Sequence, residues 1–112
     1  MDALPGATVR SGADRAVLAD AVIRLRTSRL VGMPTETVYG LAASTFDPKA
    51  IEQIYAVKER PHDNPLIAHV SSIEMARSLC RSWPNAASVL AEACWPGPLA
   101  MVLDRDRSVP AI

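Results

Sequence analysis

The chain has 112 residues, which fits one small domain and leaves no room for two large cores. Its 12 basic residues balance its 12 acidic ones, so bulk charge does not predict a protein that holds nucleic acid or an anionic membrane. The longest uncharged run, residues 93–103, is shorter than the roughly 20 residues of a membrane-spanning helix. The first residues lack the apolar stretch of a secretory signal, which predicts a cytoplasmic protein with no membrane partner.

The N-terminal third predicts a flexible segment, a helix and a strand. Residues 1–12 are rich in small residues, proline and glycine and are expected to be flexible, ahead of a folded region at 13–112. Between residues 13 and 28, apolar side chains recur at helical spacing, which predicts an amphipathic helix. The short apolar run Leu30–Met33, stopped by Pro34, is typical of a buried strand.

The middle of the chain has strong helix signals. Asp47 is suited to cap a helix that starts at Pro48 and is ended by Pro61, with Ile54 and Tyr55 on its apolar stripe. Residues 66–70 alternate in polarity and predict a strand.

The C-terminal part continues the alternation of helices and strands. Ser71 followed by Glu74 forms a capping box for a helix that stops near Trp83, and a further helix fits residues 85–94. The apolar run 99–103 predicts a last strand. The whole pattern indicates an α/β fold, with right-handed crossovers wherever neighbouring strands are parallel.

The densest group of reactive side chains is the run PTETVYGL at residues 34–41, directly after the first predicted strand. Ligands of open α/β sheets bind at the carboxyl ends of strands, so these side chains are placed to line a pocket. The alternative is that Thr35 or Thr37 caps a short helix and Gly40 serves a turn. Composition by itself favours that structural reading.

Lys58 and Arg60 stand at the predicted end of the second helix. The helix macrodipole favours cations there by roughly 0.3–1 kcal/mol, so their presence alone requires no ligand. However, Pro61 and Pro65 stiffen the loop that follows, and a lysine with an arginine is the usual pair for gripping phosphates.

The remaining candidates are single residues. His69 within a strand is more often a hydrogen-bonded structural residue than a base, and Asn64 either caps a turn or binds a carboxylate. The chain has neither a P-loop nor a Rossmann glycine motif, and no His and Cys cluster with the spacing of metal ligands.

Taken in order, the blocks PTETVYGL (34–41), KERPHDNPLIAH (58–69) and WPGPLAMVL (95–103) resemble the YrdC-like family of threonylcarbamoyl-AMP synthases. The resemblance implies a YrdC-like twisted sheet packed with helices. The family domain continues into a second half with a serine and asparagine motif, so residues 13–112 are expected to be a partial YrdC-like domain, truncated at its C-terminal side. Ala100 and Ala42 depart from the family's usual threonine and glycine.

The resemblance also implies a reaction that joins L-threonine, bicarbonate and ATP into threonylcarbamoyl-AMP and pyrophosphate, for threonylcarbamoyladenosine in tRNA. Lys58 and Arg60 match the family's KxR element and are expected to hold the ATP phosphates and stabilise charge. Thr35, Tyr39, Asn64 and His69 match residues at the L-threonine pocket. No protein nucleophile and no protein metal ligand is implied, and Mg²⁺ is expected on the triphosphate. The implied partners are tRNA-modification proteins and tRNA or double-stranded RNA.

Two alternatives remain open at this stage. One is a noncatalytic module that binds double-stranded RNA or tRNA, which the neutral net charge disfavours. The other is a carbamoyl-adenylate domain of the hydrogenase-maturation type, which the lack of zinc-finger and acylphosphatase-like segments disfavours.

Overall fold

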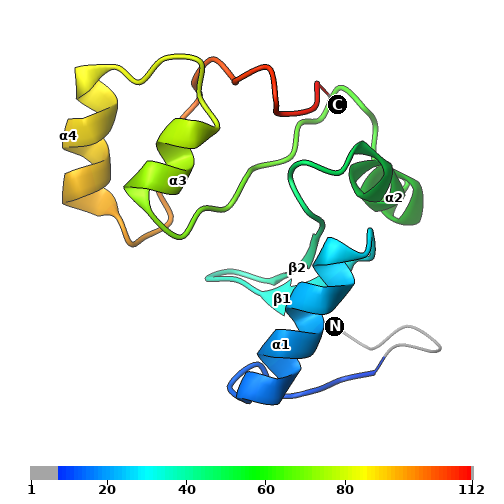
Figure 1. Cartoon of the computed structure of the whole chain (residues 1–112). Helices are drawn as coiled ribbons and strands as arrows, with labels where there is room; N and C mark the ends of the chain where they lie inside the picture. The colour runs from blue at the N-terminus through cyan, green and yellow to red at the C-terminus, as the bar shows by residue number, and fades with distance from the viewer. Residues whose placement is uncertain (1–7, 112) are drawn as a thin grey trace. The chain divides into compact units, whose positions relative to one another are not determined.

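The computed structural model describes residues 8–111 of the chain (Figure 1). It divides into two compact units, residues 1–61 and residues 62–112, and each is described by itself. The predicted flexible segment falls largely on residues 1–7, outside the described residues. No helix within residues 8–111 is long and apolar enough to cross a membrane.

The first unit begins with the predicted helix and strand. Helix α1 spans Arg15–Arg26 and is capped by Asp14, whose carboxylate accepts a hydrogen bond of 2.8 Å from the Ala16 N–H. Strand β1 (Val31–Pro34) pairs antiparallel with β2 (Tyr39–Ala42). The strand is correctly predicted, but its expected burial is wrong, because a two-stranded sheet leaves Gly32–Pro34 exposed.

Helix α2 (Pro48–Lys58) forms as predicted and supplies the core of this unit. The Asp47 carboxylate accepts a hydrogen bond of 3.1 Å from the Ala50 N–H, and Pro48 occupies the first turn. Its buried side chains are those of Ala50, Ile54 and Tyr55. The helix ends two residues before the predicted limit because Glu59 adopts a left-handed conformation, with φ of 51°.

The left-handed Glu59 leads to a prediction about stability. Glycine adopts a positive φ without the clash that a Cβ brings, and helices commonly end on glycine at this position. We expect Glu59→Gly to raise the free energy of unfolding by about 0.5–1 kcal/mol, measured by urea denaturation. The matched control is Ala56→Gly on the exposed side of the same helix, which should lower it by about 1 kcal/mol. A loss of stability in Glu59→Gly would contradict this account of the helix end.

The second unit contains two helices. Helix α3 (Ile73–Ser78) is capped by Ser72, whose hydroxyl accepts a hydrogen bond of 3.0 Å from the Met75 N–H. The predicted cap, Ser71, instead places its hydroxyl 3.6 Å from the Met75 sulfur. The helix is shorter than predicted. Helix α4 (Asn85–Cys94) has the predicted bounds, and the buried side chains of this unit are alanines: Ala76, Ala87 and Ala91.

The α/β class is confirmed, but two predicted strands do not form. Residues 66–70 and 99–103 have no strand partner in the part of the chain that the structure describes. A strand exists only where a neighbour accepts its backbone hydrogen bonds, and the second unit offers one isolated bridge, between Cys80 and Arg105. The observed sheet is antiparallel. Residues 8–111 contain no parallel pair of strands, so the crossover connections expected for parallel neighbours do not occur among them.

Candidate functional site

Thr35 opens the four-residue loop between β1 and β2. Its hydroxyl donates to the carbonyl of Val38 and accepts from the backbone N–H groups of Val38 (3.2 Å) and Thr37 (3.4 Å). The Thr35 N–H also donates to the Val38 carbonyl, at 3.1 Å. A hydroxyl has one donor and two acceptor sites, so this one is fully used within the loop. The threonine therefore closes a hairpin loop, and a substrate contact through its hydroxyl requires one of these bonds to be exchanged.

The loop bonds lead to a prediction for Thr35. We expect Thr35→Val to lower the free energy of unfolding by about 1 kcal/mol, because the loop N–H groups lose their hydroxyl partner. Thr35→Ser keeps the hydroxyl and is expected to stay close to the parent chain. Urea denaturation of the two variants measures the difference. Equal stability of the valine and serine variants would show that the loop does not depend on this hydroxyl.

Tyr39 lies next to Thr35 in the hairpin, since it pairs with Pro34 at the first position of β2. Its side chain is 59% exposed, which leaves the ring accessible to a ligand. Gly40 follows within β2 and pairs with Met33. The alternative role of Gly40 in a turn is therefore wrong.

Lys58 and Arg60 flank the left-handed Glu59 at the end of α2. The Glu59 N–H donates to the Ala56 carbonyl (3.4 Å) and the Arg60 N–H donates to the Tyr55 carbonyl (3.0 Å). These two bonds form a Schellman motif, which fixes the backbone of both basic residues relative to the helix. Lys58 is exposed, and its ammonium has no hydrogen bond or ion pair among residues 8–111. Arg60 is half-buried.

Asn64 and His69 belong to the second unit. Both are exposed, and both lie in a stretch without regular secondary structure. The His69 Nδ1 lies 3.3 Å from the Ile67 carbonyl oxygen. The structure therefore groups Thr35 with Tyr39 in the hairpin and Lys58 with Arg60 at the helix end, while Asn64 and His69 follow in the next unit.

A serine that the sequence did not single out connects α1 to α2. Ser28 has φ of 61°, and its hydroxyl donates to the carboxylate of Asp47, the cap of α2. The Gln53 side-chain amide donates to the Ser28 carbonyl at 3.0 Å. The residues that follow α1 thus contact the start of α2, the helix that ends at Lys58. No residue pattern around Ser28 indicates this contact, because it joins positions 19 residues apart.

The same contact predicts a pH dependence. The hydrogen bond from Ser28 lowers the pKa of the Asp47 carboxyl from its ordinary value of 3.8, with the Ala50 N–H as a further donor. A carboxyl with a lowered folded-state pKa stabilises the fold above its unfolded pKa and loses that contribution as the pH falls through the folded pKa. We therefore expect Ser28→Ala to be less stable than the parent at pH 7, and the gap to narrow below about pH 4. Urea denaturation across this range, with Ser44→Ala as control, measures the gap; a constant gap would contradict the coupling.

The described residues do not assemble a metal site. No group of three or more His, Cys, Asp or Glu side chains that could hold a metal ion occurs within residues 8–111. None of the candidate residues lines either of two cavities in the described chain. One of about 410 Å³ lies beside α1 and β1, and one of about 300 Å³ lies beside α4.

Comparisons with known proteins agree with the residue blocks. The family model Sua5_yciO_yrdC, described as "Telomere recombination", matches residues 24–112. The threonylcarbamoyl-AMP synthase of Pyrococcus abyssi is 46% identical over 88 residues, which are 79% of this chain and 26% of that protein. The threonylcarbamoyl-AMP synthase of Bacillus subtilis is 42% identical over 86 residues, which are 77% of this chain and 25% of that protein.

Solved structures show the same similarity. The crystal structure of P. abyssi Sua5 complexed with L-threonine superposes with a TM-score of 0.83 at 42% identity, covering 87% of this chain and 28% of that one. A doubly substituted P. abyssi Sua5 superposes with a TM-score of 0.84. The chain spans about a quarter of the length of the two curated relatives.

Proposed function

Because the chain belongs to the Sua5/YciO/YrdC family, we propose that it acts as part of a threonylcarbamoyl-AMP synthase. Such an enzyme joins L-threonine, bicarbonate and ATP into threonylcarbamoyl-AMP, pyrophosphate and water. The names of the two curated relatives support this reaction, and the complex of P. abyssi Sua5 with L-threonine supports the amino-acid substrate.

The observation that carries the proposal is the geometry at the end of α2. The Schellman motif fixes two basic residues on either side of one turn, and one of them, Lys58, has no partner among the described residues. A free ammonium and a guanidinium on a rigid backbone suit a polyphosphate, because the arginine binds oxygens in a fork and the lysine adjusts as a point charge. We assign the ATP phosphates to Lys58 and Arg60.

The chemistry requires orientation and charge stabilisation rather than a protein nucleophile. The threonine amine attacks bicarbonate and water leaves, which forms a carbamate. A carbamate oxygen then attacks the α-phosphorus of ATP, and the bond to the β-phosphate oxygen breaks to release pyrophosphate. Negative charge grows on the leaving oxygens, where Lys58 and Arg60 would stabilise it.

The L-threonine side of the site is assigned to the hairpin and to the start of the second unit. Tyr39 offers an exposed ring beside the loop that Thr35 closes. We propose that this loop contacts the substrate and that Asn64 and His69 position it. The hydroxyl of Thr35 already serves the loop, so its contribution to binding is in part to hold the loop's shape.

Magnesium is proposed to arrive with the nucleotide. The six candidate residues include no carboxylate, two of them are cations, and the Thr35 hydroxyl is already bonded, so they do not suit a hard divalent cation. Mg²⁺ commonly keeps water and phosphate oxygens as ligands, so the triphosphate itself would hold it. We further propose that the product passes to tRNA-modification proteins in the cytoplasm.

The proposal is tested by pyrophosphate release from Mg²⁺-ATP by the 112-residue chain. We expect release only when both L-threonine and bicarbonate are present. Controls omit one of the two substrates or replace L-threonine by D-threonine. Pyrophosphate release that does not depend on L-threonine, or the absence of release with all substrates present, would contradict the proposal.

A further inference from the structure

Ser28 is hydrogen-bonded to α2 at two separate points. Its hydroxyl donates to the carboxylate of Asp47, the residue that caps α2, and its carbonyl accepts from the side-chain amide of Gln53 at 3.0 Å. Gln53 lies in the second turn of α2. A single contact would leave the helix free to pivot about it, whereas contacts at the cap and at the second turn oppose both tilt and rotation about the helix axis. Ser28 therefore constrains the orientation of the helix twice.

The backbone of Ser28 is held in a strained conformation. Its φ is 61°, in the left-handed region where a Cβ clashes and which glycine adopts more readily. Both hydrogen bonds to α2 are partly buried, so water weakens them less than it would at the surface. Strained residues persist where their surroundings hold them, and they cluster at functional sites. Ser28 is therefore a candidate for a functional role.

The bond between Ser28 and Asp47 joins the two ends of the hairpin segment. The residues between them hold β1, the hairpin loop and β2, and all of these belong with α2 to the first unit. The ends of this segment are therefore held together at the point where α2 begins. At the other end of α2, the Schellman motif fixes the backbone of Lys58 and Arg60. The hairpin loop and the two cations are thus connected through Ser28.

We propose that Ser28 is a positioning residue, which holds α2 so that Lys58 and Arg60 keep a fixed place relative to the hairpin loop. This inference rests on the proposed function, in which the end of α2 binds the ATP phosphates and the loop contacts L-threonine. The carbamate reaches the α-phosphorus only when these two parts of the site are aligned, and a misplacement of about 1 Å can lower a rate roughly 100-fold. Ser28 acts through Asp47 and Gln53 rather than by contact with a substrate.

The decisive variant is Ser28→Gly, because it removes the hydroxyl and keeps the rest of the turn. Glycine adopts the left-handed conformation without strain and retains the carbonyl that Gln53 binds. We expect kcat per folded molecule for threonine-dependent pyrophosphate release to fall about tenfold, with KM for ATP and for L-threonine within about threefold, because each part of the site keeps its own contacts. Gln53→Met removes the second bond, keeps a good helix former and should act in the same direction.

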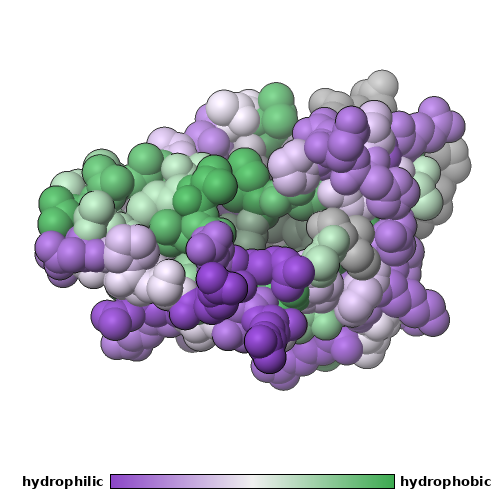
Figure 2. Space-filling view, turned by 90° about the horizontal axis from the view of Figure 1, so that it is seen from above, coloured by the Kyte–Doolittle hydropathy of each residue, from purple (hydrophilic) through white to green (hydrophobic). Residues whose placement is uncertain are grey.

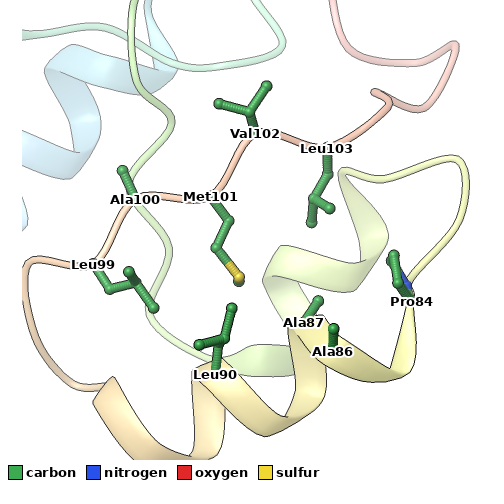
Figure 3. A pocket seen from close by; sticks show the side chains of 9 residues that line it. All are labelled: Pro84, Ala86, Ala87, Leu90, Leu99, Ala100, Met101, Val102 and Leu103. Atoms are coloured by element: carbon green, nitrogen blue, oxygen red, sulfur yellow. The ribbon is translucent and has the colours of Figure 1, made fainter.

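Two control variants separate positioning from a loss of stability. The Thr27 hydroxyl, next to Ser28, bonds only within α1, to the carbonyls of Ile23 (2.8 Å) and Arg24 (3.1 Å), so Thr27→Val should leave kcat within about twofold. In the second unit, hydrophobic side chains gather over the part of the chain that holds α3 and α4 (Figure 2). There Leu90 points towards Met101 beside the cavity of about 300 Å³ (Figure 3). Leu90→Ala should lower the free energy of unfolding without changing kcat per folded molecule. The folded fraction is measured by circular dichroism under the assay conditions.

A distance measurement tests the role of Ser28 without activity. The free cysteines, Cys80 and Cys94, are replaced by alanine. Spin labels are then attached at two exposed positions, Val38→Cys in the hairpin loop and Val57→Cys on α2. Electron paramagnetic resonance gives the distribution of distances between the labels. We expect a narrow distribution in the parent chain and a broader one in Ser28→Gly, with no substrate present.

The two measurements separate this inference from the proposed function. If the parent releases pyrophosphate and Ser28→Gly has the same kcat per folded molecule, the positioning role is overturned and the proposed function stands. Equal label distributions in the parent and in Ser28→Gly, or equal broadening in Thr27→Val, would also overturn it. A parent without threonine-dependent release contradicts the proposed function, and the label distances then decide by themselves whether Ser28 fixes α2.

Discussion

Replacing Arg60 or Lys58 by alanine is expected to abolish most of the threonine-dependent release of pyrophosphate. Each change removes a cation that would stabilise charge on the phosphates as the bond to pyrophosphate breaks. Loss of one such group typically lowers the rate by roughly 10²–10³-fold. Both positions are held by the backbone bonds at the end of α2, so the effect should fall on the reaction rather than on the fold.

The chain contains a matched control for this prediction. Lys49 is the other lysine, and it lies at the opposite end of α2 with an exposed side chain. Lys49→Ala removes the same charge from the same helix and should leave the rate within about twofold. Arg60→Lys keeps the charge but not the fork, so it should restore only part of the rate. Unchanged turnover in both Lys58→Ala and Arg60→Ala would overturn the assignment of the phosphate site.

Replacing Tyr55 by alanine is expected to have the largest effect on stability. Tyr55 is the largest fully buried side chain among the described residues, with 2% of its surface exposed, and it packs in α2 beside Ile54, which is 5% exposed. Truncation of a buried aromatic side chain costs about 3–5 kcal/mol through lost burial and the cavity left behind. Few other large side chains are buried in this unit, so little can compensate.

Urea denaturation measures the effect of Tyr55→Ala. The control is Val57→Ala, two residues along the same helix, where the valine is 56% exposed. Its effect is expected to stay within about 0.5 kcal/mol, since little surface leaves water there on folding. A loss below about 1 kcal/mol in Tyr55→Ala would show that the first unit does not depend on this buried ring.

Local signals predicted the helices well. Asp47 and Pro48 marked the start of α2 correctly, and α4 has the bounds expected from its sequence. The signals that predict these helices are a capping residue and the spacing of apolar residues. Both act within the helix itself, so no contact with a distant segment is required. The Ser71 cap was wrong by one residue, because Ser72 accepts the hydrogen bond from the Met75 N–H and Ser71 lies outside the helix end.

The sequence likewise predicted some features of the candidate site and missed others. The order of its residue blocks predicted the family, which the family model confirms over residues 24–112. The alternative role predicted for Thr35, as the cap of a short helix, is wrong, because its hydroxyl closes the loop between β1 and β2. The pairing of β1 with β2 and the contact of Ser28 with the cap of α2 were not predicted.

The sequence by itself determined the helices, the position of the two cations at a helix end and the family. Tertiary structure decided which extended segments become strands. Residues 39–42 pair with β1, whereas 66–70 and 99–103 have strand-like patterns without a paired neighbour among the described residues. The physical reason is that helical hydrogen bonds close within the segment that forms them, while a strand's hydrogen bonds are made to another segment.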